Sequence, residues 1–80
     1  MPETISPAQC RAARALVNIS QDDLAASAKV AKSTIANFEQ GKSVPYAKNM
    51  ADIIAALEAA GVEFTNGGEP GVKLRKGKKR

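Results

Sequence analysis

Apolar residues recur every three or four positions in four stretches of the chain, a spacing that predicts four helices. The stretches cover about residues 7–17, 21–28, 32–40 and 47–60. Ser6 and Ser20 each precede a stretch and have an amide or an acid three residues later, which is a capping-box start. Gly41 and Gly61 stand where left-handed residues would end the third and fourth helices. The expected fold class is mainly α, with a compact four-helix domain over residues 1–61.

Each predicted helix has one apolar side that we expect to face a shared core. The helix over 7–17 contributes four core positions, and the later helices contribute nine more. The expected core residues are Cys10, Ala13, Leu16, Val17, Leu24, Ala25, Ala28, Ile35, Phe38, Met50, Ile53, Ile54 and Leu57.

The period changes after Gly61, where apolar and polar residues alternate. Val62 and Phe64 precede the turn-forming sequence TNGGEPG, and Val72 and Leu74 follow it, so residues 62–75 are expected to form a short β-hairpin with a flexible loop. An isolated hairpin is marginal in water. It must therefore pack on the helices or add to a partner's strands, and we favour a dimer contact. The basic residues at 76–80 are expected to be disordered.

One side of the stretch 32–40 is polar. The side opposite the apolar positions carries a ridge of short side chains with hydrogen-bonding groups, formed by Lys32, Ser33, Ala36, Asn37 and Gln40. Such a ridge can enter a groove.

The residue types exclude several classes of site. Histidine is absent and Cys10 is the single cysteine, which excludes disulfides, Cys/His zinc sites and histidine-dependent catalysis. We expect no metal, cofactor or small-molecule ligand, and an enzyme is the weakest option because the sequence contains no credible nucleophile and base. The longest apolar run, residues 53–57, is too short for a membrane span, so we expect no membrane association and a cytoplasmic location.

The formal net charge of +4 is distributed unevenly. Six of the twelve basic residues lie in the last eight positions, so the rest of the chain carries six basic residues against all eight acids. Positive charge is often the footprint of a nucleic-acid partner. Here the excess positive charge lies at the C-terminal end. Any binding of nucleic acid by the rest of the chain would depend on where its charged residues are placed.

The pair of helices around residues 20–41 resembles the helix-turn-helix of the phage-repressor family of transcriptional regulators, the Cro/cI-like or xenobiotic-response-element type. The resemblance is carried by Gln21, Ile35, Glu39 and Gly41. It implies a lambda-repressor-like DNA-binding domain, here followed by the short β-hairpin and the basic tail. The resemblance to the family's compact helical domain extends over about residues 7–57.

Three positions depart from the family pattern. Asn18 replaces the glycine that usually ends the first helix, and Lys29 replaces the glycine of the turn. Asparagine tolerates the left-handed conformation, whereas a lysine there costs about 1 to 2 kcal/mol. Ala31 replaces the usual Ser or Thr cap of the recognition helix, a loss of about 1 kcal/mol. We therefore expect a domain of modest stability.

The resemblance implies that Lys32, Ser33, Ala36 and Asn37 are the base-contacting residues, with the recognition helix at 32–40 lying in the major groove. Their chemistry agrees with this role. Lysine donates to guanine, asparagine pairs with adenine, serine can donate or accept, and an alanine methyl can meet a thymine methyl. The alternative is a solvated helix face. Arg14 and Glu39 would form a structural ion pair, unless Arg14 is merely solvated.

Contacts with the DNA backbone are expected beside that face and at the C-terminal end. Gln21, Lys42, Ser43, Tyr46 and Lys48 are the expected phosphate contacts. Sequence-independent contacts are expected from six basic residues, which could instead serve only solubility. These residues are Lys73, Arg75, Lys76, Lys78, Lys79 and Arg80.

The leading functional hypothesis is a sequence-specific double-stranded DNA-binding regulator that acts as a homodimer on an inverted repeat, with a contact to RNA polymerase where an operator adjoins a promoter. Family members of this size are commonly regulators of prophages and mobile elements. The alternative is an antitoxin-like or antiactivator-like protein-binding module on the same fold.

Overall fold

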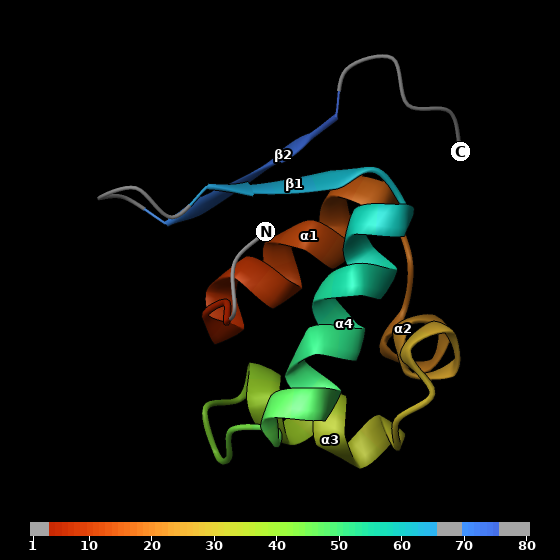
Figure 1. The fold of residues 1–80 in the computed structure, drawn as a ribbon, viewed down its shortest axis with the longest axis vertical. Coiled ribbons are helices and arrows are strands. Elements are labelled where there is room, and N and C mark those ends of the chain that lie inside the picture. Colours follow the sequence, from red (N-terminus) through yellow and green to blue (C-terminus); the bar gives the residue numbers. More distant parts are fainter. Residues whose placement is uncertain (1–3, 66–69, 76–80) are drawn as a thin grey trace.

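The computed structural model describes residues 4–65 and 70–75, which form four helices and a two-stranded antiparallel sheet. The elements in chain order are α1 (Pro7–Val17), α2 (Gln21–Ala28), α3 (Lys32–Glu39), α4 (Ala47–Ala59), β1 (Val62–Thr65) and β2 (Gly71–Leu74). In Figure 1 the hairpin lies across one end of the molecule and α3 lies at the other end. The predicted mainly α fold with a C-terminal hairpin is confirmed. The flexible loop predicted at 66–69 and the disordered tail predicted at 76–80 lie outside the described residues.

The first two helices begin with complete capping boxes. The Ser6 hydroxyl accepts from the backbone N–H of Gln9, and the Gln9 side chain accepts from the backbone N–H of Ser6. Ser20 and Asp23 make the same exchange at the start of α2. By contrast, Ala31 provides no side-chain cap for α3. The first turn of α3 therefore has backbone N–H groups that no cap satisfies.

Among the described residues, two that are not glycine have backbone angles in the left-handed region. Asn18 ends α1 with φ 59°, and Lys29 ends α2 with φ 60°. Lysine has no local hydrogen bond to offset the contact between its Cβ and the following carbonyl oxygen, so the turn between α2 and α3 is strained at this position. Gly41, at φ 78°, meets the same requirement without a Cβ.

The helices enclose one hydrophobic core. Cys10, Leu24, Ile35, Ile53, Ile54 and Leu57 are completely buried, and Phe38 and Met50 are nearly so. The assignment of Leu16 to the core was wrong, because Leu16 is 39% exposed. A helix turns by about 100° per residue, so Leu16 falls on the flank of the stripe defined by Cys10, Ala13 and Val17.

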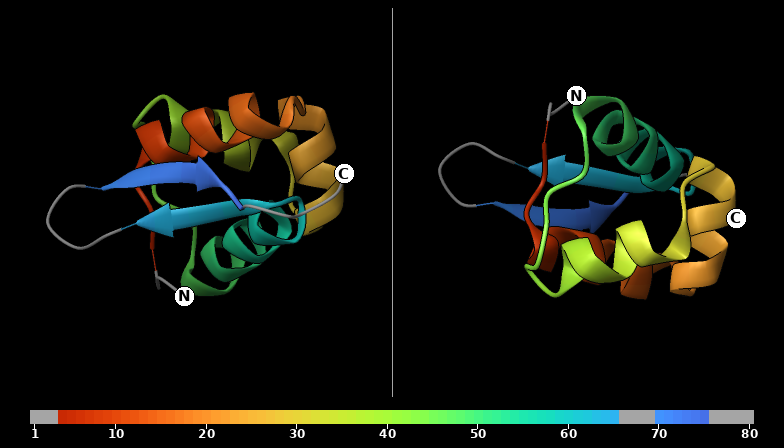
Figure 2. Two further views of the ribbon diagram at one scale, coloured as in Figure 1. Left: turned by 90° about the horizontal axis from the view of Figure 1, so that it is seen from above. Right: turned by 90° about the horizontal axis from the view of Figure 1, so that it is seen from below.

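The hairpin packs on the helices of its own chain. Val62 is completely buried, and Phe64 and Val72 pack against the core as a cross-strand pair. The Gln9 side chain, buried in α1, donates to the carbonyl oxygens of Gly71 at 3.0 Å and Thr65 at 3.4 Å. Seen from above, the strands lie over α1 and α4 (Figure 2). The hairpin was predicted either to pack on the helices or to add to a partner's strands. In the structure it packs on the helices.

Candidate functional site

The polar side of α3 is exposed at one end of the molecule. Ile35 and Phe38 point into the core, whereas Lys32 and Ser33 are exposed and Asn37 is half-buried. Seen from below, α3 lies toward the viewer (Figure 2). The helix is therefore fixed by its apolar side and presents its polar side outward.

A hollow of about 320 Å³ lies beside α3, between this helix and the segment that leads into α4. It brings two predicted base-contacting residues, Ser33 and Asn37, together with two predicted backbone contacts, Ser43 and Tyr46. The full lining is Ser33, Thr34, Asn37, Ser43, Val44, Pro45, Tyr46 and Asn49. The lining consists of hydroxyl, amide and apolar groups, so the hollow offers hydrogen-bond donors with no carboxylate among them.

Two residues of this lining, Thr34 and Asn49, were not predicted from the sequence. Both residues are half-buried, and both are polar. Thr34 lies one turn before Asn37 on α3, and Asn49 lies one turn after Tyr46 in α4, so helical spacing could have indicated each of them. Helical spacing does not show that residues of α3 and of the start of α4 line the same hollow.

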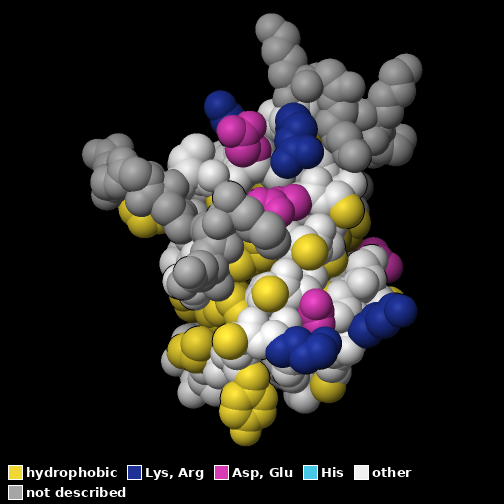
Figure 3. All heavy atoms as spheres, viewed as in Figure 1, with side chains coloured by type: hydrophobic (Ala, Val, Ile, Leu, Met, Phe, Trp, Pro, Cys, Tyr) yellow, Lys and Arg dark blue, Asp and Glu magenta, His cyan; other side chains and the backbone are white. Residues whose placement is uncertain are grey.

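The lysines near α3 have acidic neighbours. Lys32 Nζ lies 3.4 Å from Asp22 Oδ1, and Lys48 Nζ lies 2.9 Å from Asp52 Oδ2. Lys42, also a predicted backbone contact, is exposed. On the face drawn in Figure 3, Lys and Arg side chains lie beside Asp and Glu side chains instead of forming a continuous basic patch. Exposed pairs of this kind are worth less than about 1 kcal/mol, so neither pair prevents its lysine from also reaching a phosphate or a base.

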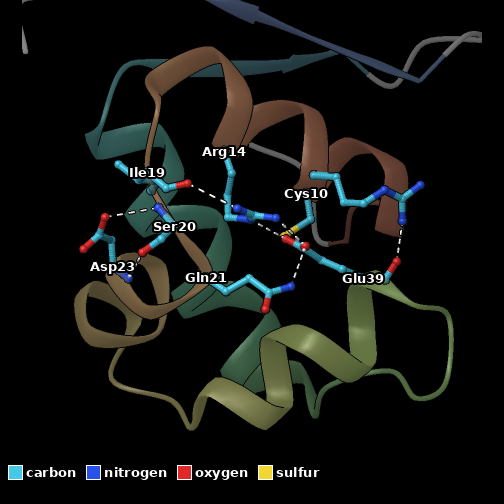
Figure 4. Close-up of polar contacts among 8 residues, drawn as sticks. Cys10, Arg14, Ile19, Ser20, Gln21, Asp23 and Glu39 are labelled. Carbon is cyan, nitrogen blue, oxygen red and sulfur yellow. Dashed lines mark hydrogen bonds and ion pairs between the residues drawn. The ribbon is translucent and has the colours of Figure 1, made fainter.

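A buried carboxylate fixes the other end of α3. Arg14 donates from Nε to Glu39 Oε2 and from Nη2 to Glu39 Oε1, each at 2.7 Å. The Gln21 amide donates to Oε1 at 3.0 Å, and the Cys10 thiol donates to Oε2 at 3.2 Å. Arg11 donates to the backbone carbonyl of Glu39. Figure 4 shows these side chains converging on Glu39 from α1 and α2.

The ionisation of this cluster follows from its surroundings. Burial alone would raise the pKa of Glu39, but the hydrogen bonds from Arg14, Gln21 and Cys10, with the Arg14 charge, lower that pKa below its ordinary value. The hydrogen bond to Glu39 raises the pKa of Arg14. Burial, followed by the hydrogen bond to Glu39 and its charge, raises the pKa of Cys10 to about 12. The pair is therefore ionised and the thiol is protonated at neutral pH.

The structure gives Gln21 a second task besides the predicted phosphate contact. One amide hydrogen is used by Glu39, which leaves the other available at the start of α2. Because Glu39 belongs to α3, the Gln21 side chain also ties the two helices of the motif together.

The structure does not bring Lys73 or Arg75, two of the predicted C-terminal contacts, to α3. Lys73 lies in β2 and Arg75 follows it, at the opposite end of the molecule from α3 (Figure 1). The predicted contacts of Lys76, Lys78, Lys79 and Arg80 lie outside the described residues.

Within the ranges 4–65 and 70–75, no group of three His, Cys, Asp or Glu side chains is arranged to hold a metal ion. In the same part of the chain, no helix is long and apolar enough to cross a membrane.

Residues 11–64 match the model of the helix-turn-helix family HTH_3, a span that runs from α1 to β1 and includes α2 and α3. A search of curated proteins finds no match.

Proposed function

Since the chain belongs to the helix-turn-helix family HTH_3 of DNA-binding transcriptional regulators, we propose that it reads a specific double-stranded DNA sequence with the polar side of α3. The observation that carries the proposal is the contrast between the two sides of this helix. Ile35 and Phe38 are locked in the core, while Lys32 and Ser33 are exposed on the other side. A helix held in this way can enter the major groove without rearrangement of the core.

Each base-facing residue has a distinct partner in the groove. Lys32 donates to guanine O6 and N7, and Asn37 makes a bidentate contact with adenine N6 and N7. Ser33 can donate or accept, and the Ala36 methyl is small enough for close approach to a thymine methyl. The half-burial of Asn37 supports this assignment, since a restricted side chain loses less entropy when it forms two directed hydrogen bonds.

The residues around the hollow would hold the sugar–phosphate backbone and set the register of α3. Ser43 and Tyr46 would supply hydroxyl donors from this hollow. Lys42, in the preceding loop, and Lys48, on α4 outside the lining of the hollow, would add positive charge. Gln21 would supply its remaining amide hydrogen from the start of α2. Contacts of this kind fix position and carry no base information.

The basic residues of the hairpin end would serve a different stretch of DNA. Lys73 and Arg75 lie at the end of the molecule that points away from α3 (Figure 1). The sequence-independent contacts proposed for Lys73 and Arg75 would therefore be with DNA outside the base pairs beneath α3.

We propose that two copies bind an inverted repeat. Half-sites in successive major grooves on one face of the duplex are about 34 Å apart. A protomer with dimensions of 32 × 28 × 19 Å fills this spacing, so neighbouring copies would meet. Regulation would then follow from occupancy, with the bound dimer excluding RNA polymerase or contacting it from an adjacent site.

One observation favours a second candidate function, the capture of a protein. Val44 is 77% exposed and Tyr46 is 85% exposed, and they are adjacent to Pro45 beside α3. Figure 3 shows hydrophobic side chains at the surface of this end of the molecule. An antitoxin-like or antiactivator-like protein would use such a patch. The hydrogen-bonding groups of the hollow favour DNA, because a protein-capturing surface needs fewer of them at its centre.

Selection from a randomised duplex pool of about 30 base pairs tests the proposal, since that length holds two half-sites. We expect an enriched inverted repeat and, on that duplex, two copies per DNA by light scattering. A pool that stays random after selection would contradict sequence reading. An enriched site occupied by one copy would contradict the dimer alone.

A further inference from the structure

We propose that Asp22 is a positioning residue: its carboxylate orients the Lys32 ammonium at the start of α3, which sharpens the base choice of Lys32 and lowers affinity for unrelated DNA. The inference rests on the proposed function, because it concerns the same surface. Asp22 is exposed at the start of α2, beside the first residue of α3.

The geometry places Asp22 where it can act on Lys32. Asp22 is the second residue of α2 and Lys32 is the first residue of α3, and Nζ and Oδ1 are 3.4 Å apart. The two side chains are 72% and 57% exposed, so both ends of the pair remain accessible to a ligand. The pair therefore spans the two helices at the point where α3 would enter the groove.

Helix capping does not account for Asp22. The capping box of α2 uses Asp23, whose carboxylate accepts from the backbone N–H of Ser20 at 3.1 Å. Asp22 interacts favourably with the helix dipole, but any acid in the first turn would do so equally. The contact with Lys32 is what distinguishes Asp22 from its neighbour.

A neighbouring carboxylate can sharpen the base choice of a lysine. Its ammonium is a compact charge on a flexible four-carbon chain, so by itself it attracts phosphates and guanines alike. A carboxylate on one side restricts the position of the ammonium and directs its remaining hydrogens toward the edge of a base. In free protein the pair contributes little, because water and salt screen it. In a complex that excludes water, the same attraction strengthens.

The Asp22 carboxylate also opposes phosphate groups near the start of α2. On the correct site, this repulsion is offset by the oriented contact of Lys32 with guanine. On unrelated DNA the offset is missing, so Asp22 weakens binding there more than on the correct site. The expected result is a higher ratio of specific to non-specific affinity, which is the quantity that matters among many competing sites.

The Lys48–Asp52 pair cannot serve the same purpose. Both residues lie on α4 at a spacing of four, which is an ordinary pair along one helix. It does not connect α2 with α3. This contrast is why the inference is confined to Asp22 and Lys32.

Asp22→Asn tests the inference, with Asp23→Asn as the matched control. Both substitutions remove one negative charge from the same helical turn, and asparagine at position 23 can still accept from the Ser20 N–H. Wild type, both single variants, Lys32→Met and the Asp22→Asn/Lys32→Met double variant would each be selected on the randomised duplex pool. Affinities for the enriched duplex and for the unselected pool would follow by titration, after circular dichroism has shown that each variant is folded.

We expect Asp22→Asn to bind the unselected pool about two- to fivefold more tightly and to relax base preference by a similar factor at the position read by Lys32. Asp23→Asn should raise pool affinity while keeping that base preference. In the Lys32→Met background, Asp22→Asn should leave base preferences unchanged.

Unchanged base preference in Asp22→Asn, or equal relaxation in Asp23→Asn, would overturn the positioning role while leaving the proposed function intact. A wild-type protein that enriches no sequence at all would overturn both.

Discussion

Arg14 on α1 and Glu39 at the end of α3 are joined by two hydrogen bonds of 2.7 Å, in which Arg14 Nε donates to Glu39 Oε2 and Nη2 donates to Oε1. The Glu39 side chain is 3% exposed and the Arg14 side chain is 21% exposed. Asn37, the residue proposed to read adenine, precedes Glu39 by two positions. The pair therefore fixes the helix that carries the reading face.

Replacing Arg14 with Met should destabilise the domain by about 3 kcal/mol, because it leaves the buried Glu39 carboxylate without its cation. That loss is a large part of the roughly 4 to 12 kcal/mol expected for a domain of this size. Urea denaturation followed by circular dichroism measures the change.

The double variant Arg14→Met/Glu39→Met is the control for this prediction. It removes both charges, so it should be more stable than Arg14→Met by at least about 1 kcal/mol. Equal stability of the two variants would mean that the cost comes from lost packing of Arg14 and not from an unpaired carboxylate.

Stability should fall in acid through Glu39. Its pKa is lower in the folded protein than the ordinary value of 4.5, so the carboxylate stabilises the fold above that value. The contribution is lost as pH falls through the lowered folded pKa. We expect the urea midpoint to decline below about pH 4.5 in wild type and to decline less steeply in Glu39→Gln. Parallel curves for the two proteins would assign the acid sensitivity to other groups.

Lys29→Gly should stabilise the domain by about 1 kcal/mol. Lys29 has φ 60°, and glycine adopts this conformation without the clash of a Cβ, although it also gains freedom in the unfolded chain. Asn18→Gly is the matched control, since Asn18 has φ 59° but tolerates it better. Its effect on thermal unfolding should be smaller. A larger gain at Asn18 would show that strain at Lys29 is not what limits stability.

Charge near α3 should affect DNA binding more than charge on the hairpin. Lys42→Gln should weaken binding to all duplexes and reduce the slope of log affinity against log salt by about 1. Lys73→Gln, at the other end of the molecule, should leave that slope unchanged on a duplex that covers only the two half-sites. An equal effect of the two variants would show that the hairpin end also contacts this DNA.

The elements were predictable because their ends are marked locally. Ser6 and Ser20 carry complete capping boxes, and Gly41 has the left-handed conformation that its position implies. Leu16 was misassigned because apolar character alone does not locate the edge of a buried stripe. The hydrogen bonds from Gln9 to the hairpin also escaped prediction, since they connect residues more than 50 positions apart.

The candidate site was only partly visible in the sequence. Spacing on one helix selects Lys32, Ser33 and Asn37, because a single period relates them. Spacing does not show that Asn49 of α4 faces Ser33 and Asn37 across a hollow, or that the Asp22 carboxylate lies 3.4 Å from Lys32. Both features depend on how separate helices pack.

The most direct test of the central claim, that the polar side of α3 reads bases, is the affinity of Asn37→Ala for the selected duplex and for random duplex. We expect a loss of about 1 to 3 kcal/mol on the selected duplex, with relaxed preference at one base position and little change on random DNA. An equal loss on both duplexes would contradict base reading by α3.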